Sequence, residues 1–363
     1  MRALKAKKVL PFIGAGFSTA AGLPGWLGLL EDIYSRMDDP KLEFDDVKSS
    51  CNGDPLRIAE YMFLLAGEQI GPLRHRMATS LAPPQNFLSS AHIELSNLDL
   101  PVVYTTNFDE LIEETYRQLG IPYARMATTR DLALDRAGRR RVMKFHGDMQ
   151  HDSSLVLTEK SFFDRLEFSN PLDIRLRSDL LGKSILFLGY GFGDVNIRVL
   201  WHRLGQLMSD VPTEERPHSF IVRLDADPVL ERLDRSVGLT TIVLDPEANK
   251  KTPEEKTVLL ERFMLQLTLE SHAEEQAGPD PVCSPRILQD AAEILRRTEV
   301  QPLSPPEAQL LEAASSRSLP ERVRQYAEDL LDAYSKATLY GDAAEFRKRY
   351  VLNFDLSFSP EEE

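Results

Sequence analysis

Two glycine-rich segments of this sequence can bring backbone N–H groups close to a phosphate. They contain, in chain order, Gly14, Ala15, Gly16 and Ser18, and then Gly189, Tyr190 and Gly191. Glycine lets the backbone approach a pyrophosphate closely, and the N-terminus of a following helix offers free N–H groups. A lone G-x-G is equally typical of a tight turn between a strand and a helix, so that alternative stays open.

Two further segments carry side chains that could bind a sugar or move a proton. Asn107 and Asp109 flank a phenylalanine, and His146 precedes a glycine. A neutral imidazole can accept or donate a proton near pH 7. The alternative for Asn107 and Asp109 is a helix cap, since both residue types are good N-caps. The alternative for His146 is a structural histidine at the end of a strand.

All four segments follow short apolar runs that predict buried strands. Continuous apolar runs, with helical patterns between them, are typical of a parallel sheet covered on both faces. The six predicted strands are Lys8–Ile13, Pro101–Thr106, Arg141–Phe145, Ser184–Leu188, Ser219–Leu224 and Thr240–Leu244. We therefore expect an α/β fold with a Rossmann-like, doubly wound parallel sheet. Ligands of such sheets bind outside the carboxyl ends of the strands, where the four segments lie.

The rest of the chain is predicted to be helical. We expect a sheet domain over residues 1–270, with a helical insert at about 40–95. The segment 271–285 is rich in Pro, Glu and Ala and predicts a linker. Residues 286–363 then form a C-terminal helical segment. Its apolar residues at Val323, Tyr326, Leu330 and Tyr334 must be covered, either by the parent domain or by another subunit.

Composition limits the functional class. The net charge of −14 opposes direct nucleic-acid binding, which needs a basic surface. No run of eighteen apolar residues appears, so we expect no membrane span. The apolar run Val9–Ile13 after the basic N-terminus is too short for a signal peptide, so we expect a cytoplasmic location. The two cysteines, Cys51 and Cys283, form no C-x-x-C pair, so no structural zinc site is expected.

The motifs together resemble the sirtuin family. G-A-G-x-S, G-L-P, T-x-N-x-D, H-G and G-x-G occur in that order between about Lys8 and Asp245. They are most similar to the bacterial sirtuin-like branch that hydrolyses NAD⁺ in antiphage defence. The resemblance implies an inverted-order Rossmann sheet and NAD⁺ as substrate.

The resemblance also implies roles for the strand-end residues. Gly14, Ala15, Gly16 and Ser18 would surround the diphosphate, and Gly189, Tyr190 and Gly191 would lie near the adenosine side. Asn107 and His146 would be catalytic, and Asp109 would lie near the nicotinamide carboxamide. Departure of neutral nicotinamide through an oxocarbenium-like transition state needs a rigidly held ribose more than a strong acid.

Two departures from the family pattern separate its branches. Protein deacylases of the family carry a four-cysteine zinc module after the histidine and an Asp-Phe-Arg after Gly-x-Pro. This chain has neither, and Gly25-Trp26-Leu27 stands in place of the second. The expected function is thus an NAD⁺ glycohydrolase of antiphage defence. The alternatives are a protein deacylase or ADP-ribosyltransferase, and a regulatory NAD⁺- or ADP-ribose-binding subunit of an ATPase or nuclease complex. Expected partners are a second copy of the chain and a HerA-type ATPase.

Overall fold

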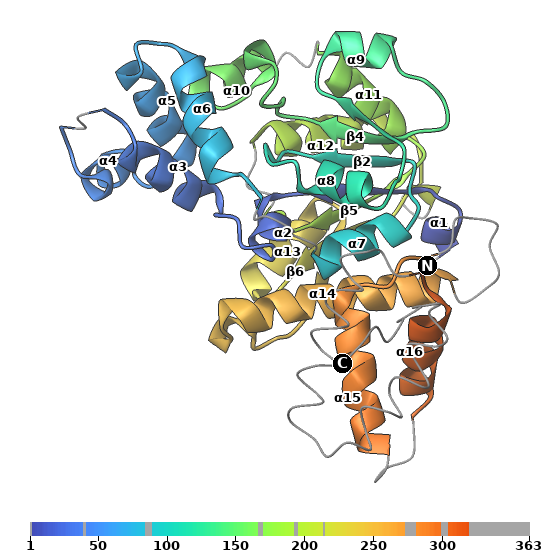
Figure 1. Cartoon of the computed structure of the whole chain (residues 1–363). Helices are drawn as coiled ribbons and strands as arrows, with labels where there is room; N and C mark the ends of the chain where they lie inside the picture. The colour runs from blue at the N-terminus through green and yellow to red at the C-terminus, as the bar shows by residue number, and fades with distance from the viewer. Residues whose placement is uncertain are drawn as a thin grey trace. The chain divides into compact units, whose positions relative to one another are not determined.

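A computed structural model describes residues 2–38, 41–83, 89–165, 170–191, 195–212, 215–272, 281–298 and 304–318 (Figure 1). The described chain divides into two compact units. One unit comprises Arg2–Gln85 and Leu100–Thr257, and we call it the sheet unit. The other comprises Asn86–Asp99 and Val258–Glu363, and we call it the helical unit. Each is described by itself.

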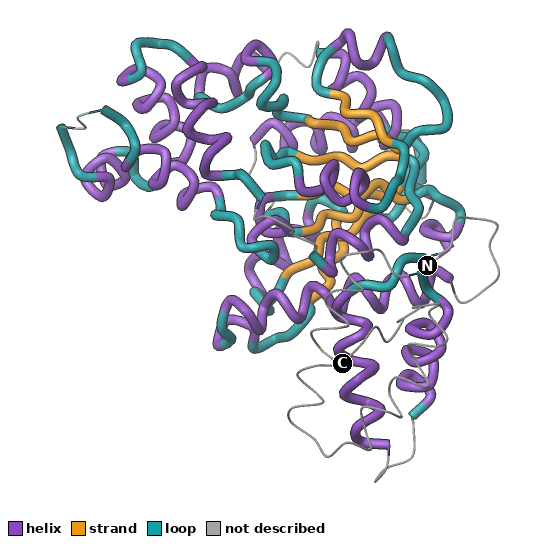
Figure 2. Tube along the Cα trace, viewed as in Figure 1, coloured by secondary structure: helices purple, strands orange, loops and turns teal. Residues whose placement is uncertain are grey.

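The sheet unit contains a sheet in which every pairing between neighbouring strands is parallel, in the order β3-β4-β2-β1-β5-β6-β7. Figure 2 shows its strands in orange. The strands are β1 (Val9–Ile13), β2 (Val102–Thr105), β3 (Tyr123–Met126), β4 (Arg140–Lys144), β5 (Ser184–Leu188), β6 (Ser219–Arg223) and β7 (Leu239–Val243). The predicted α/β fold with a parallel, Rossmann-like sheet is confirmed.

The sequence analysis missed β3. This strand lies at the edge of the sheet, and its residues alternate between partly buried and buried, so it lacks a continuous apolar run. Arg125 also interrupts the pattern, because its side chain pairs with Glu110 and Asp148 instead of entering the core.

Helices of the sheet unit precede and connect the strands. They are α1 (Arg2–Lys5), α2 (Ala15–Thr19), α3 (Trp26–Ser35), α4 (Phe44–Ser50), α5 (Pro55–Leu65), α6 (Ile70–Ser80), α8 (Leu111–Gln118), α9 (Thr129–Ala133), α10 (Glu159–Arg165), α11 (Pro171–Leu180), α12 (Val195–Leu207) and α13 (Pro228–Ser236), with 3-10 turns at Asp152–Ser154 and Ala248–Lys250. The predicted helices after the first two strands and before the last are present as α3, α8 and α13.

One face of the sheet forms an aromatic-rich core with α11 and α12. Phe12 of β1 lies at its centre, with ring centroids 5.3 Å from Phe187 and 6.2 Å from Phe145. Leu172, Leu176 and Leu180 of α11 recur at i, i+4 and i+8, so one helical stripe is buried in this core. Such burial stabilises the fold by roughly 1.5–3 kcal/mol for each large apolar side chain.

Several helices pack together in and around the segment at about 40–95, for which a helical insert is predicted. Helices α3, α4, α5 and α6 pack on one another, and α10 packs on α5. Figure 1 shows this group beside the end of the sheet at which β1 leads into α2. Helix α7 (Ser90–Asn97), which overlaps the end of the expected 40–95 range, belongs to the helical unit.

The helical unit consists of α7, the greater part of α14 (Pro253–His272), α15 (Pro285–Thr298) and α16 (Pro305–Ser316). Polar contacts hold distant parts of the sequence together within it. Asn97 exchanges two 2.7 Å hydrogen bonds with the backbone of Val282. The buried Arg317 guanidinium donates to both carboxylate oxygens of Glu94, at 2.9 and 3.0 Å.

The expected domains at 1–270, 271–285 and 286–363 stay a prediction. The greater part of the predicted linker, and the residues Val323, Tyr326, Leu330 and Tyr334, lie outside the described residues. Among the described helices, none combines the length and apolar character required to cross a membrane.

Candidate functional site

Strand register brings the four sequence motifs to one edge of the sheet. Lys144, Thr105, Ile13 and Leu188 are level with one another across the neighbouring strands β4, β2, β1 and β5. All of these strands are parallel, so the residues that follow them emerge at the same edge. Strand β1 lies where the order of the strands reverses, which is the position at which doubly wound sheets bind ligands.

The two glycine segments pack directly against each other at this edge. The Gly14 N–H donates to the Leu188 carbonyl and the Gly16 N–H donates to the Gly189 carbonyl, both at 2.9 Å. A Cβ on Gly14 would lie 2.5 Å from the Gly189 oxygen, and one on Gly16 would lie 2.9 Å from it. Both glycines are therefore required by the close approach of two backbones, which the sequence could not distinguish from a phosphate-binding role.

Ser18, Asn107 and Asp109 form one hydrogen-bonded cluster. The Asn107 side-chain amide donates to Ser18 Oγ at 2.9 Å, and Ser18 Oγ donates to Asp109 Oδ2 at 2.8 Å. The other carboxylate oxygen of Asp109 accepts the Leu111 N–H at 3.2 Å, although the N-cap of α8 is Glu110, whose side chain makes no capping hydrogen bond. All three side chains are buried, and the cluster joins α2 to the end of β2.

The Asn107 turn is further fixed by Thr105. Its hydroxyl donates to the Ile13 carbonyl and accepts the Asn107 N–H, both at 3.0 Å. Phe108 packs against Trp26 at the start of α3, with ring centroids 5.9 Å apart. Trp26 is therefore in contact with the Asn107–Asp109 turn rather than with the sheet core.

His146 follows β4 in a tight turn. Its ring packs edge-on against Phe162 of α10, with centroids 4.9 Å apart. The next residue, Gly147, has φ of +85°, and a Cβ there would lie 2.1 Å from the Ser154 carbonyl oxygen. Glycine is thus the residue that allows the chain to turn away directly after His146.

A largely buried cation, Arg165, holds the backbone beside His146; its side chain is 10% exposed. Arg165 donates to the Phe145 carbonyl at 2.5 Å and pairs with Asp173. Burial raises the pKa of Asp173, and the charge and hydrogen bond of Arg165 oppose that rise. Sequence reasoning did not single out Arg165, because an arginine at the end of an exposed helix pattern gives no sign that it is buried.

Tyr190 is placed differently from its neighbours. Its ring lies in the hydrophobic core, 5.4 Å from Phe187 and 5.3 Å from Phe12 between centroids. Only its backbone is therefore available at the sheet edge. Gly191 is exposed and has space around it for a Cβ.

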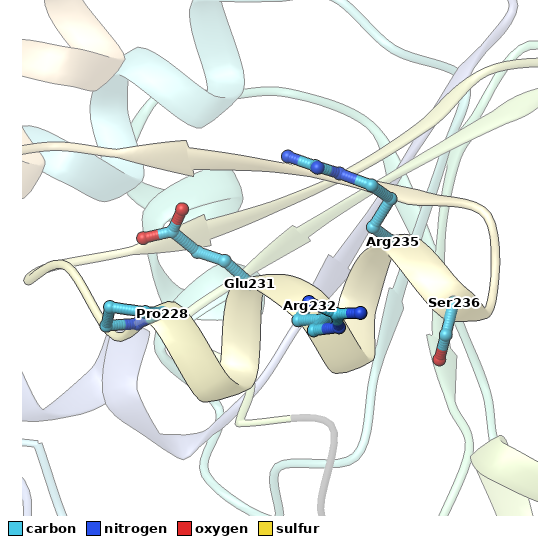
Figure 3. A pocket seen from close by; sticks show the side chains of 5 residues that line it. All are labelled: Pro228, Glu231, Arg232, Arg235 and Ser236. Carbon is cyan, nitrogen blue, oxygen red and sulfur yellow. The ribbon is translucent and has the colours of Figure 1, made fainter.

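A surface hollow of about 510 Å³ lies elsewhere, along α13 (Figure 3). Its lining residues are Pro228, Glu231, Arg232, Arg235 and Ser236. None of the strand-end motifs lines it, so the hollow and the candidate site are separate. Within the described part of the chain, no group of three or more His, Cys, Asp or Glu side chains could hold a metal ion.

Comparison with known proteins shows which family part of the chain is similar to. Residues 101–242 match the model of the SIR2-like domain, a range that includes Asn107, Asp109, His146 and Gly189. The chain is 29% identical over 209 residues to the NAD(+) hydrolase ThsA of Cytobacillus dafuensis, which covers 57% of this chain and 40% of that protein. It is 30% identical over 220 residues to the NAD(+) hydrolase ThsA of Enterococcus faecium, covering 58% and 42%.

The chain is also similar to the defense-associated sirtuin 2 of Bacillus subtilis, with 26% identity over 228 residues, 61% of this chain and 21% of that protein. The matched region thus spans less than half of the length of each of these relatives. The predicted resemblance to the sirtuin-like family is confirmed, and residues 101–242 match its SIR2-like domain.

Proposed function

We propose that this protein is an NAD⁺ glycohydrolase, which cleaves NAD⁺ to nicotinamide and ADP-ribose. The observation that carries the proposal is the Ser18–Asn107–Asp109 cluster, set beside the close-packed Gly14, Gly16 and Gly189 backbone at the switch point of a SIR2-like sheet. Two relatives, each similar to more than half of the chain, are named NAD(+) hydrolases.

The site chemistry suits loss of a neutral leaving group. Asn107 is held by Ser18 through its amide nitrogen, which leaves its carbonyl oxygen to bind ribose hydroxyls and the attacking water. His146 would accept a proton from that water or from a ribose hydroxyl. Asp109 is assigned to the nicotinamide carboxamide, although its carboxylate already accepts from Ser18 and Leu111, so holding Ser18 is its first role.

The remaining substrate contacts follow the family resemblance. The backbone and side chains of Gly14, Ala15, Gly16 and Ser18 would surround the diphosphate. Gly189, Tyr190 and Gly191 would lie near the adenosine side, with Tyr190 contributing its backbone, since its ring is in the core. NAD⁺ is the substrate in this scheme, and no zinc is needed.

The biological setting belongs to the same proposal. An NAD⁺ hydrolase that depletes the cofactor would act as an effector of bacterial antiphage defence in the cytoplasm. Such an enzyme needs control, which we assign to assembly into a homo-oligomer and to a partner such as a HerA-type ATPase. Light scattering of the purified chain, and the genes that neighbour its own, test these two assignments.

The proposal is tested by incubating the protein with NAD⁺ and separating the products. Release of nicotinamide and ADP-ribose without any acyl-lysine peptide is expected. Asn107→Ala and His146→Ala should each lower turnover by at least about 100-fold. His75→Ala is the matched control, because His75 lies exposed on α6, and it should leave turnover unchanged.

Other outcomes separate the alternatives. Cleavage that requires an acetyl-lysine peptide would indicate a deacylase, and transfer of ADP-ribose to protein would indicate a transferase. Binding of NAD⁺ or ADP-ribose without turnover, also with a partner ATPase present, would indicate a regulatory subunit. Near-normal hydrolysis by folded His146→Ala protein contradicts the role given to His146.

A further inference from the structure

Lys144 is an unusual residue for the end of a buried strand. Its side chain has no exposed surface, whereas lysine is almost never fully buried unless it is paired. Its ammonium lies 3.4 Å from Glu113 Oε1 of α8, a side chain that is itself only 2% exposed. Between Met143 and Phe145, an apolar side chain would stabilise the fold at least as well as Lys144 does, because a buried ion pair seldom stabilises a protein more than well-packed apolar residues.

The hydrogen bond made by Lys144 points to a different purpose. Its ammonium donates to the backbone carbonyl of Asp109 at 2.5 Å. The Glu113 carboxylate, in contrast, has no hydrogen-bond partner among the described residues. Lys144 therefore contacts the Asn107–Asp109 turn directly, while Glu113 supplies only a compensating charge.

A series of hydrogen bonds links Lys144 to the side-chain amide of Asn107 through Asp109 and Ser18. Lys144 holds the carbonyl of Asp109, the carboxylate of Asp109 accepts from Ser18, and Ser18 accepts from the Asn107 side chain. Asp109 is thus fixed at both its backbone and its side chain. Removing the backbone contact frees the residue through which Ser18 and Asn107 are positioned.

We propose that Lys144 is a positioning residue, which fixes the Asn107–Asp109 turn through the Asp109 carbonyl, with Glu113 as its counter-ion. The effect on turnover rests on the proposed NAD⁺ hydrolysis, while the effect on the turn does not. Lys144 touches no reacting atom in this scheme. It acts by holding Asn107 in the geometry that the reaction requires, and displacement of such a group by about 1 Å can cost 100-fold in rate.

The variants separate two roles of Lys144, which are to hold the Asn107–Asp109 turn and to balance the charge of Glu113. Lys144→Met alone leaves Glu113 without its counter-ion, and burial already raises the pKa of Glu113, so this variant is expected to lose stability. The double variant Lys144→Met/Glu113→Met replaces the pair by apolar side chains and should regain that stability. Glu113→Gln keeps Lys144 and its bond to Asp109.

Two measurements are made on each variant of the full chain. Steady-state kinetics with NAD⁺ should show kcat lowered at least about tenfold in both Lys144 variants, with KM changed less than kcat, and kcat retained in Glu113→Gln. Hydrogen exchange should show faster exchange of the Asn107 and Leu111 amides in the Lys144 variants, since both amides donate within the turn. Lys183→Met is the matched control, because Lys183 pairs with Asp179, outside the Asn107–Asp109 turn.

The outcomes distinguish a failure of the proposal for Lys144 from a failure of the proposed NAD⁺ hydrolysis. A stable double variant with wild-type kcat and wild-type exchange overturns it, because Lys144 would then serve only to balance Glu113. Equal loss of kcat in Glu113→Gln and in the Lys144 variants also overturns it. Absence of NAD⁺ hydrolysis by the unchanged protein would contradict the proposed function, but hydrogen exchange at Asn107 and Leu111 would still decide whether Lys144 holds the turn.

Discussion

At the scale of single residues, Gly189 has the most restricted environment in the site. Its φ is +60°, and a Cβ would lie 2.0 Å from the Phe17 nitrogen. Gly189→Ala must therefore displace the backbone of α2 as well as adopt a left-handed conformation, which alone costs about 1–2 kcal/mol. We expect a loss of at least about 2 kcal/mol in the free energy of unfolding, measured by urea denaturation, together with a loss of NAD⁺ turnover.

Gly182→Ala provides the comparison for Gly189→Ala. Gly182 lies before β5, has no positive φ, and has no atom within 4 Å of an added Cβ. The free energy of unfolding of this variant should lie within about 0.5 kcal/mol of that of the original protein. Equal stability of the two variants would show that the close approach of residues 14–16 to Gly189 is not required.

The sequence predicted where the site residues lie better than it predicted what each of them contacts. Asn107, Asp109 and His146 follow strands that end level with one another, as the apolar runs predict, and the carboxyl ends of such strands are where ligands bind. Ser18 was assigned to a phosphate, whereas its hydroxyl joins Asn107 to Asp109. Lys144 was passed over, because its partner Glu113 lies on another element and no local pattern marks a buried ion pair.

At the scale of elements, the carboxylate of Asp179 joins α11 to β2. It accepts from the Tyr104 hydroxyl and from Lys183, both at 2.8 Å. Burial opposes ionisation of this carboxyl, but the hydrogen bonds from Lys183 and Tyr104 outweigh it and hold its pKa below the ordinary value. The ionised form is therefore bound more tightly in the folded chain than in the unfolded one.

The sign of this pKa shift predicts the effect of pH on Asp179→Asn. The contribution of the ionised carboxyl is fully present above the unfolded pKa of about 3.9, and is lost as the pH falls through the lower folded pKa. Asp179→Asn should lower the free energy of unfolding by about 1–2 kcal/mol at pH 7. The difference in this free energy between the variant and the original protein should become smaller only below about pH 4. Urea denaturation at several pH values measures this, with exposed Asp210 changed to Asn as the control. A difference that already narrows between pH 8 and 6 would contradict the assignment to Asp179.

Elements with a continuous apolar run could be predicted, and the others could not. Strands β1 and β5 are buried at every residue, so their sequences alone identify them. Strand β3 is half-buried, and α7 contains the buried polar residues His92, Glu94 and Asn97, which periodicity assigns to a solvated face. Their places depend on partners distant in sequence, such as Arg317 for Glu94.

At the scale of the whole chain, apolar residues of α15 are already buried. Ile287, Leu288 and Ala291 of α15 are at most 3% exposed within a single copy of the chain. These residues are therefore not free to form contacts between subunits. Any interface in the proposed homo-oligomer must use other surfaces, and changes within the helical unit should affect its stability first.

Arg317→Met tests whether the buried charge cluster holds the helical unit together. Arg317 is 4% exposed and donates to both oxygens of Glu94, which is fully buried and also accepts from Thr268 at 2.6 Å. Removing the guanidinium leaves the Glu94 carboxylate buried without its counter-ion, which costs about 3–5 kcal/mol. Glu94→Gln/Arg317→Met removes that charge as well and should recover part of the loss.

Arg262→Met is the control, because the Arg262–Asp290 pair is 58% exposed on the arginine side and exposed pairs contribute roughly 0–1 kcal/mol. The measurement is limited proteolysis, with the cleavage sites identified by mass spectrometry. Faster cleavage is expected within residues 258–318 of Arg317→Met, with slower cleavage in the double variant, while equal rates in Arg317→Met and Arg262→Met would mean that the buried pair does not hold the helical unit together.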